Sequence, residues 1–432
     1  MRMKLDLGRS FIGEENEKRM ASGFRSQAMN NASTVKKTLL VSTYHFYLDP
    51  SNGAAITTRE LLHALALLGW RVHTFCGCAL DFQDKRNPVE FLESRGIAPK
   101  RIVDSTQTCG YSLVNFQDGA IHSTLFLPED NSHMPSPQMG EKFLPILNQI
   151  IGVARPQILA TYGSYWLSDH ILSVAKINSL KTAFLLQNHS YKNLKDFVKV
   201  DLTITPSNYT ATHYSELLGL PSTPIAPMMD WDSFICDPSS MKRKYVVMVN
   251  PEPSKGGLLV ARIAHELWKR RPDIPILLVE GRAKASWLKL VEIDWTGVRN
   301  VHVMECTTDP RDFYKEAYLI IVPSYYPETF CRVAAEAMAN GIPVIVSSRG
   351  ALPEVVGDAG IILDISARLL ENAKLTPMKE DAEEWVRNIL LLWDNKELYE
   401  DFSRRARERA QRWRPEIIAA HYDNVLSALI ER

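Results

Sequence analysis

The alternation of apolar runs with amphipathic segments along the chain predicts strands and helices in regular succession. Residues 37–43 (KTLLVST) form a short continuous apolar run, which is typical of a strand buried on both faces. The apolar positions that follow repeat at helical spacing, namely Leu61, Leu62, Leu65 and Leu68. An apolar run at 70–75 comes next, so the segment is a β-loop-α-β unit, from which parallel, doubly wound sheets are built.

The flanking residues predict where this first helix begins and ends. A loop is expected over 44–55, and either Thr57 or Thr58 can then cap the first turn of the helix. Gly69 closes the helix, because glycine readily adopts the left-handed conformation that is common at helix C-termini.

The same pattern continues and then restarts. Three further strands are expected in the first half, at 157–162, 182–187 and 202–205. Residues 221–244 contain four Pro and several turn-forming residues, so we expect them to link two domains. The second series comprises strands at 245–249, 275–279, 319–322 and 343–347 and helices at 257–270 and 330–339. The predicted fold is therefore α/β, with two Rossmann-like halves and a crevice lined by strand ends.

The two ends of the chain differ in character. Residues 1–36 are polar, mixed in charge and without a steady apolar period, so we expect a flexible tail. From Ala382 onward the pattern is amphipathic helix. Residues 404–414 (RRARERAQRWR) are strongly basic, but acidic residues interleave with them, which favours a solvated helix face over a contact with nucleic acid or membrane.

Composition narrows the functional classes. The 432 residues are 45% hydrophobic and 23% charged, as in ordinary soluble globular proteins. Because 50 Lys and Arg offset 50 Asp and Glu, no global field draws the chain to nucleic acid, and an anionic ligand must be held locally. No apolar run reaches the ~18 residues of a membrane span, and the N-terminus has no apolar segment for secretion. Six scattered Cys indicate a reducing, cytoplasmic compartment.

The most informative stretch is 322–350 (VPSYYPETFCRVAAEAMANGIPVIVSSRG). A buried strand ends, a loop carries Glu328, and a helix is expected to start near Thr329 with free backbone N–H groups over 329–331. Such a helix N-terminus binds anions or hydroxyl groups. Glu336 lies about two helical turns deeper, so the two carboxylates can bind different parts of one extended polar ligand. A solvated helix Glu is the alternative for Glu336, since burial among small apolar residues is costly without partners.

This stretch resembles the Glu-x7-Glu signature of retaining glycosyltransferases of family 4, also called glycosyltransferase group 1. Glu328 and Glu336 would be its two glutamates. The match continues in segments 340–347 (NGIPVIVS), 350–360 (GALPEVVGDAG), 249–257 (VNPEPSKGG) and 279–282 (VEGR). It is weaker in the first half of the chain.

The family has the GT-B fold, in which two Rossmann-like domains face each other across a cleft. The resemblance implies an acceptor-side domain over 37–225, completed by the helix 415–432, and a nucleotide-sugar-binding domain over 241–414. Domain closure over the donor is expected of a two-lobed protein, with the hinge near 221–244.

The resemblance also implies roles for the residues of the signature. It places Glu336 on the ribose hydroxyls of a sugar nucleotide and Glu328 on hydroxyls of the transferred sugar. The backbone N–H groups of Thr329, Phe330 and Cys331 would face the sugar or the diphosphate. Glycine is usual where Cys331 stands, and a side chain there narrows the approach to the sugar pocket.

A cation is needed at this site, because breaking the glycosidic bond leaves charge on the oxygens of the departing diphosphate. Lys255 fits, since it follows a strand and precedes Gly256-Gly257, where a backbone can approach a phosphate closely. The family usually has an Arg five residues earlier, where this chain has Asn250, which we also assign to donor binding. Arg282, at the end of the next strand, can supply the missing charge. A solvated residue remains the alternative for Lys255 and for Arg282.

The first half contributes weaker candidates. His189 ends a buried strand, and the resemblance places near this point a His that reaches the donor sugar or phosphate. A hydrogen-bonded structural His is an equal alternative. Asn52-Gly53 matches the Gly-rich segment where the family brings backbone N–H groups toward the donor, although a two-residue turn has the same letters. Ser207 and Asn208 resemble another cleft loop.

No metal site is expected. Asp230-Trp231-Asp232 pairs two carboxylates, as metal sites of a different glycosyltransferase fold do, but it lies in the expected linker. We expect Lys255 and helix N-termini to bind the phosphates instead. No cofactor is expected beyond the donor substrate itself, a UDP- or GDP-linked sugar.

Together these features predict a retaining, metal-independent glycosyltransferase that moves a hexose from a nucleotide-diphosphate sugar to a glycan, lipid-linked or small-molecule acceptor. Its partners would be the donor and the acceptor, and no nucleic acid is expected. A peripheral membrane contact is left open, as is the oligomeric state. Two alternatives remain. Asn250 and Cys331 depart from the family pattern, which favours a GT-B protein that binds without catalysis. A GT-B sugar-nucleotide epimerase or a phosphorylase is the other.

Acceptor specificity is expected where the resemblance is faintest. These regions are 44–55 and 105–140. The second is long and polar and contains three Pro, so we expect it to be a mobile lid.

Overall fold

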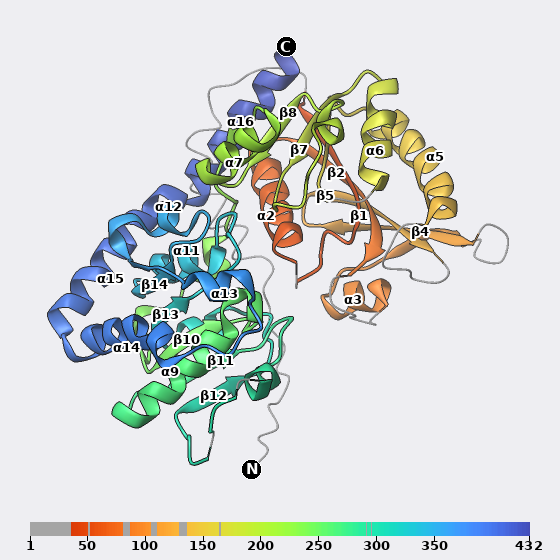
Figure 1. Ribbon diagram of the computed structural model, residues 1–432. Helices are drawn as coiled ribbons and strands as arrows, with labels where there is room; N and C mark the ends of the chain where they lie inside the picture. The colour runs from red at the N-terminus through yellow and green to blue at the C-terminus, as the bar shows by residue number, and fades with distance from the viewer. Residues whose placement is uncertain are drawn as a thin grey trace.

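The computed structural model describes residues 36–50, 52–80, 87–104, 110–128, 136–163, 166–290, 292–294 and 296–432. The expected tail lies outside these ranges except for its last residue. The described residues form two α/β lobes, the first at the upper right of Figure 1 and the second at the lower left. None of the described helices combines the length and the apolar composition that crossing a membrane requires.

The first lobe is built on a sheet whose described strands run in the order β3-β4-β5-β2-β1-β6-β7-β8-β9. The strands are β1 Thr38–His45, β2 Arg71–Ala79, β3 Lys100–Asp104, β4 Tyr111–Asp118, β5 Ile121–Pro128, β6 Ile158–Thr161, β7 Lys181–Leu185, β8 Leu202–Thr205 and β9 Thr223–Pro224. Neighbouring strands are parallel except in the β3–β4 and β4–β5 pairs. β1 lies inside the sheet and is buried on both faces, as its continuous apolar run predicts.

β4 and β5 overturn the prediction of a mobile lid for much of 105–140. They form an antiparallel hairpin in continuous register, and β5 also pairs in parallel with β2. The hairpin turns at Gly119-Ala120, since Asp118 pairs with Ile121, and Gly119 has a φ of 57°. Glycine at the first position of a two-residue turn is a sequence signal for a hairpin, and it was missed. Residues 105–109 and 129–135 of the expected lid lie outside the described residues.

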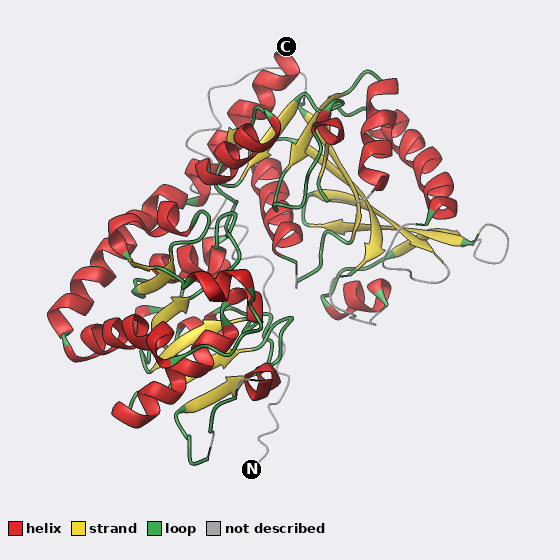
Figure 2. Ribbon diagram, viewed as in Figure 1, coloured by secondary structure: helices red, strands yellow, loops and turns green. Residues whose placement is uncertain are grey.

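Helices cover both faces of this sheet (Figure 2). They are α2 Gly53–Leu67, α3 Pro88–Ser94, α5 Pro137–Ala154, α6 Trp166–Ile177 and α7 Asn208–Leu218. Leu39 and Val41 pack in one core with Leu61 of α2, whereas Leu40 packs on the opposite face with Phe143 of α5 and Ile171 of α6. The alternation of side chains along β1 therefore supplies both cores.

α2 begins five to six residues earlier than the sequence predicts. Its N-cap is Asn52, whose side-chain Oδ1 accepts from two backbone N–H groups of the first turn at 2.8 and 3.2 Å. Thr57 and Thr58 are buried inside the helix, so the prediction that one of them is the cap is wrong. Asn is a stronger N-cap than Thr, and it stands directly before a run of residues that can continue the helix.

The second lobe is built on a parallel sheet whose described strands run in the order β12-β11-β10-β13-β14-β15. The strands are β10 Tyr245–Val249, β11 Ile276–Val279, β12 Val301–Met304, β13 Ala317–Val322, β14 Val344–Ser347 and β15 Ile361–Leu363. The helices of the linker and this lobe are α8 Trp231–Phe234, α9 Gly257–Arg270, α10 Arg311–Tyr314, α11 Arg332–Ala339, α12 Leu352–Val356, α13 Ala367–Glu371, α14 Lys379–Asp394 and α15 Lys396–Ala410. In chain order the sheet reads 3-2-1-4-5-6, the order of dinucleotide-binding Rossmann domains.

The chain returns to the first lobe at its end. Helix α16, Pro415–Glu431, packs beside α2, as Figure 1 shows. Leu426 and Leu429 of α16 are buried in the same core as Leu61. Asp423 accepts hydrogen bonds from Lys37 Nζ at 3.0 Å and from Trp70 Nε1 at 2.8 Å. The last helix is therefore a structural part of the first lobe.

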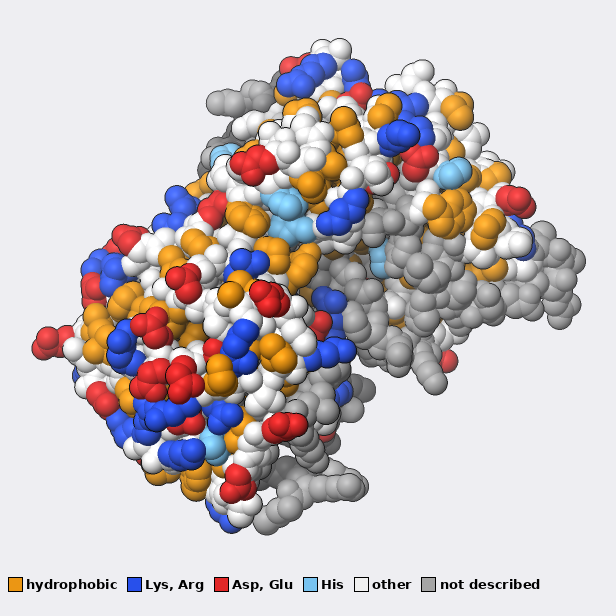
Figure 3. Space-filling model, in the orientation of Figure 1, with side chains coloured by type: hydrophobic (Ala, Val, Ile, Leu, Met, Phe, Trp, Pro, Cys, Tyr) orange, Lys and Arg blue, Asp and Glu red, His pale blue; other side chains and the backbone are white. Residues whose placement is uncertain are grey.

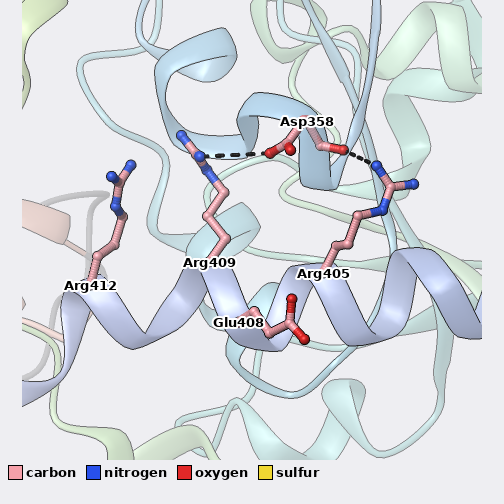
Figure 4. Close-up of a pocket in the computed structure, with 5 residues that line it drawn as sticks. All are labelled: Asp358, Arg405, Glu408, Arg409 and Arg412. Carbon is pink, nitrogen blue, oxygen red and sulfur yellow. Dashed lines mark hydrogen bonds and ion pairs between the residues drawn. The ribbon is translucent and has the colours of Figure 1, made fainter.

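The basic run at 404–414 lies on α15 and the turn after it. Lys and Arg are interspersed with Asp and Glu over the visible face of this lobe (Figure 3). Arg404 is exposed and paired with acidic neighbours, as a solvated face would be. Arg405 instead donates to the backbone carbonyl of Asp358, just after α12 (Figure 4). Arg409 Nε donates to the carbonyl of Val355, near the end of α12, at 2.6 Å. The prediction of a solvated face is wrong for these two, because the last carbonyls of a helix need donors.

If α16 belongs to the core of the first lobe, Leu426→Ala should lower the free energy of unfolding by about 2–4 kcal/mol, because it leaves a cavity. Leu426 is 2% exposed, whereas Ile417 on the same helix is 43% exposed. Ile417→Ala is therefore the matched control, with an expected loss below about 1 kcal/mol. Urea unfolding of both variants measures the difference, and equal losses would contradict this packing.

Candidate active site

Two strand ends of the second sheet meet at the point where the strand order reverses. The chain leaves β10 toward β11 on one side and leaves β13 toward β14 on the other, which opens a crevice between them. β10 is followed by a 3₁₀ turn, Pro253–Lys255. The backbone N–H groups of Tyr325 and Tyr326, in the loop after β13, donate to the Ser254 carbonyl at 2.9 and 3.1 Å. The two loops are therefore fastened together.

Lys255 and Glu328 form an ion pair in this crevice. Lys255 Nζ lies 2.5 Å from Glu328 Oε1, which also accepts from Ser324 Oγ at 3.0 Å. The Lys255 side chain is 32% exposed and the Glu328 side chain 10%. Burial opposes the charge of Lys255, but the Glu328 carboxylate outweighs burial and raises the pKa of Lys255. The site thus holds a permanent cation beside a largely buried carboxylate.

Gly256 and Gly257 serve the packing of the loops. A Cβ on Gly256 would lie 2.1 Å from the Pro323 carbonyl oxygen, and one on Gly257 would lie 2.3 Å from that of Pro251. The space beside both Cα atoms is filled by the chain itself. The expected close approach of a phosphate to these glycines is not available on that side. Gly256 instead lets the loops after β10 and β13 touch, and Gly257 lets the loop after β10 fold back on itself.

Asn250 and Arg282 occupy different places. Asn250 has a φ of 57°, and its Oδ1 accepts from the backbone N–H of Ala283 at 2.9 Å, which ties the end of β10 to the loop after β11. Arg282 is exposed. It follows β11 and stands next to Ala283, whose backbone Asn250 holds, so Arg282 lies at the same edge of the sheet as Lys255.

Residues 329–331, which follow Glu328, are not yet helix. α11 begins at Arg332, three residues later than the sequence predicts, because Cys331 has a φ of 84° and a ψ of 81°. The Thr329 carbonyl accepts from Ser207 Oγ at 2.7 Å, so this residue contacts the first lobe. Phe330 is buried, and its ring meets that of Trp413 edge-on at 5.6 Å. Residues 329–331 therefore form a loop that joins the lobes just before the N-terminus of α11.

Cys331 occupies a strained backbone position beside the ion pair. Few residues other than glycine adopt its left-handed φ, which accounts for the family's preference for glycine here. Burial, followed by the nearby Glu328 carboxylate, raises the pKa of the Cys331 thiol to about 12. The thiol is therefore neutral at physiological pH and is not a nucleophile in this state.

Glu336 is a buried carboxylate, 7% exposed, and each of its two oxygens accepts a hydrogen bond. Its Oε1 accepts from Arg332 Nε and its Oε2 from Tyr314 OH, each at 2.9 Å. Burial raises the pKa of Glu336, and Arg332 opposes the rise. The alternative of a solvated helix Glu is excluded. Sequence reasoning missed both partners, although Arg332 stands four residues before Glu336, a spacing that pairs charges on a helix.

His189 lies at the junction of the lobes and is 8% exposed. Its Nε2 is 3.4 Å from Thr210 Oγ1, and its ring centroid is 6.1 Å from that of Tyr326 in the second lobe. Burial and the neighbouring His213 lower the pKa of His189 to about 4, so the ring is neutral at pH 7. Figure 3 shows a group of His side chains on the surface where the lobes meet.

The remaining candidates of the first lobe lie at helix N-termini. Gly53 is exposed at the start of α2, with open space where a Cβ would stand. Ser207 caps α7, and Glu354 of the second lobe accepts from the backbone N–H of Asn208 at 3.0 Å. The N-terminus of α7 is thus occupied by a carboxylate from the other lobe.

The described residues contain no group of three or more His, Cys, Asp or Glu arranged to hold a metal ion. Asp230 instead caps the short helix α8, where its Oδ1 accepts from the backbone N–H of Asp232 at 3.1 Å.

Comparisons with known proteins agree with the two-lobed α/β architecture described above. Residues 237–409, which make up most of the second lobe, match the family model described as Glycosyl transferases group 1. The two-lobed α/β architecture is the GT-B fold, as in sucrose-phosphate synthase from Thermosynechococcus elongatus. That structure has a TM-score of 0.66 at 17% identity and covers 92% of this chain and 100% of its own. The catalytic domain of starch synthase IV from Arabidopsis thaliana, bound to ADP and acarbose, has a TM-score of 0.65 at 11% identity, with 92% and 100% covered.

Relatives by sequence match only part of the chain. The lipopolysaccharide 1,2-N-acetylglucosaminetransferase of Salmonella typhimurium is 34% identical over 115 residues, which are 24% of this chain and 30% of that protein. The D-inositol 3-phosphate glycosyltransferase of Segniliparus rotundus is 31% identical over 137 residues, 30% of each chain. The matched segments thus span less than a third of these curated relatives.

The neutral state of His189 predicts a pH-dependent stability. The pKa of His189 falls from an ordinary 6.5 to about 4, so between these values the unfolded chain binds the proton more readily. His189 therefore lowers stability by up to about 3 kcal/mol as the pH decreases from 6.5 to 4. His189→Gln should remove this part of the decrease in chemical-denaturation midpoints, while His170→Gln, at an exposed position of α6, should not. Parallel pH profiles of wild type and His189→Gln would contradict the burial of a neutral ring.

The strain at Cys331 predicts a stabilising substitution. Cys331→Gly should raise the free energy of unfolding by about 1 kcal/mol, because glycine tolerates the left-handed φ. Cys331→Ala is the matched control, since it removes the thiol but keeps the Cβ, and it should give no gain. Thermal unfolding separates the two, and equal midpoints would mean that the backbone is not strained.

Proposed function

We propose that this protein is a glycosyltransferase that transfers a sugar from a nucleotide-diphosphate donor, bound in the crevice of the second lobe, to an acceptor bound against the first lobe. The observation that carries the proposal is the Lys255–Glu328 ion pair at the topological switch point of a Rossmann sheet, with the buried carboxylate of Glu336 on the helix that follows. The match of residues 237–409 to the glycosyltransferase group 1 model supports it. The relatives named above are themselves glycosyltransferases.

Each charged group has a place in such a reaction. Lys255 would stabilise the negative charge that develops on the diphosphate as the glycosidic bond breaks, with Arg282 as a second cation at the rim. Glu328 would bind hydroxyls of the transferred sugar, and Glu336 those of the ribose. His189 is neutral, so it would act as a hydrogen-bond donor or acceptor rather than as a cation.

The finer features of the reaction extend this proposal. We propose retention of configuration without a metal ion, by front-side attack assisted by the leaving phosphate. Support comes from the likeness to family 4 and from a crevice in which Lys255 can do the electrostatic work of a metal. The donor would be a UDP- or GDP-linked hexose, the acceptor a glycan, a lipid-linked molecule or a small molecule, and the location the cytoplasm.

A GT-B protein that binds a ligand without catalysis is the second candidate. Asn250 favours it, because its side chain ties two loops together where the family usually has a cation. Arg282, in the same crevice, argues for the enzyme. Release of nucleotide from a donor in the presence of acceptor distinguishes the two.

Lys255→Ala should lower kcat for donor turnover by about 10²–10³-fold, because it removes the charge that stabilises the leaving group. Glu336→Gln should raise KM for the donor more than it lowers kcat, because the ribose is bound equally before and during the reaction. Lys242→Ala is the control, since this Lys is 63% exposed and pairs with Glu316 at the surface. Mass detection of released nucleotide measures kcat and KM of all three variants. An unchanged kcat in Lys255→Ala, or an unchanged KM for the donor in Glu336→Gln, would show that the site is assigned wrongly.

A further inference from the structure

Arg332 lies between two carboxylates that come from different lobes, the partly buried Glu60 and the buried Glu336. Its Nη1 and Nη2 donate to the two oxygens of Glu60 on α2, at 2.6 and 3.0 Å. Its Nε donates to Glu336 Oε1 at 2.9 Å. Nη1 also lies 3.1 Å from Thr57 Oγ1 and 3.2 Å from the Met228 carbonyl. The guanidinium is thus clamped from several directions, and only 18% of the side chain is exposed.

The charges of this cluster are uneven. Glu60 and Glu336 share one cation, and their side chains are 13% and 9% exposed. Glu60 raises the pKa of Glu336, whereas Arg332 lowers it. The two carboxylates keep Arg332 charged despite its burial. Without Arg332, two buried carboxylates would face each other unpaired, which is strongly unfavourable.

The cluster leaves Glu336 able to bind a ligand. An ionised carboxylate can accept about four hydrogen bonds, and Arg332 and Tyr314 use one on each oxygen. Two acceptor positions remain, which is the number that the adjacent hydroxyls of a ribose need. Because one bond fixes each oxygen, the plane of the carboxylate is set before a ligand arrives.

We propose that Arg332 is a positioning residue, which holds Glu336 in the orientation that binds the donor ribose and makes this orientation depend on Glu60 of the opposite lobe. The inference rests on the proposed function. Since Glu60 and Glu336 belong to different lobes, ribose binding and the placement of the lobes are coupled through one guanidinium. A residue of the first lobe thereby contributes to nucleotide recognition by the second.

The experiment compares nucleotides with and without the two ribose hydroxyls. Binding of UDP and of 2′,3′-dideoxy-UDP, and of the matching guanosine pair, is measured by calorimetry for the wild type, Glu60→Gln, Arg332→Met and Arg332→Lys. The wild type should prefer the nucleotide that carries the hydroxyls by about 10-fold. Arg332→Met should lose this preference, and Glu60→Gln should reduce it about 3–10-fold. Arg332→Lys should be intermediate, because lysine cannot pair with both carboxylates in the same geometry.

Two comparisons separate positioning from a purely structural role. A structural role would weaken both nucleotides of a pair equally and leave the preference intact, and that result would overturn the inference. Arg404→Met is the matched control, because Arg404 also pairs with a Glu four residues away, at 3.0 Å, but on the exposed face of α15. It should leave the preference unchanged. If Arg332→Met does not fold, Glu60→Gln, which keeps the size of the side chain, carries the test.

The outcomes also separate the inference from the proposed function. If the wild type prefers the hydroxyl-bearing nucleotide and the variants keep that preference, the positioning role is wrong and the proposed function stands. If the wild type binds no nucleotide of either pair, or binds both members equally, the ribose role of Glu336 is wrong, and the inference fails with it.

Discussion

Parallel strands place their carboxyl ends at one edge of a sheet, and the candidate site of this protein depends on that constraint. Lys255 follows β10 and Glu328 follows β13, so residues 73 positions apart meet because their strands are neighbours. The segment after β14, the next strand of the sheet, supports Glu328 from the other side. The Glu328 backbone forms a β-bridge with Gly350, and the Glu328 carbonyl accepts from the backbone N–H of Ala351 at 2.8 Å. The order of the strands therefore sets the geometry of the crevice.

The charged side chains at this edge of the sheet are paired because the edge buries them. A buried ion is tolerated only with a partner, and each ionic group of the crevice has one. The pairing also limits the chemistry. A diphosphate that binds Lys255 must compete with Glu328, and such competition is weakest when the hydroxyls of a sugar take over the carboxylate. The ion pair thus favours a ligand that brings an anion and hydroxyls together over free phosphate.

Local patterns were sufficient to predict most of the fold and part of the site. Continuous apolar runs predicted β1 and β10 closely, because strands buried on both faces have no other composition available. The two glutamates and Lys255 could be found because their motif is contiguous. The start of α11 could not, because it depends on the left-handed backbone of Cys331, a conformation that its residue type disfavours. Glu60 carries no local signal, since its role depends on a partner in the other lobe.

The chain passes between the lobes twice, before β10 and again at α16, and the second passage bears on how the protein folds. The bond between Lys37 and Asp423 joins positions 386 residues apart, and the core around β1 includes side chains from the last helix. During synthesis the first lobe emerges first, but α16, a part of its core, is translated only after the whole second lobe. The first lobe therefore keeps an apolar face uncovered until α16 has left the ribosome. The second lobe takes none of its strands or helices from α16, so it can fold before the first lobe is complete.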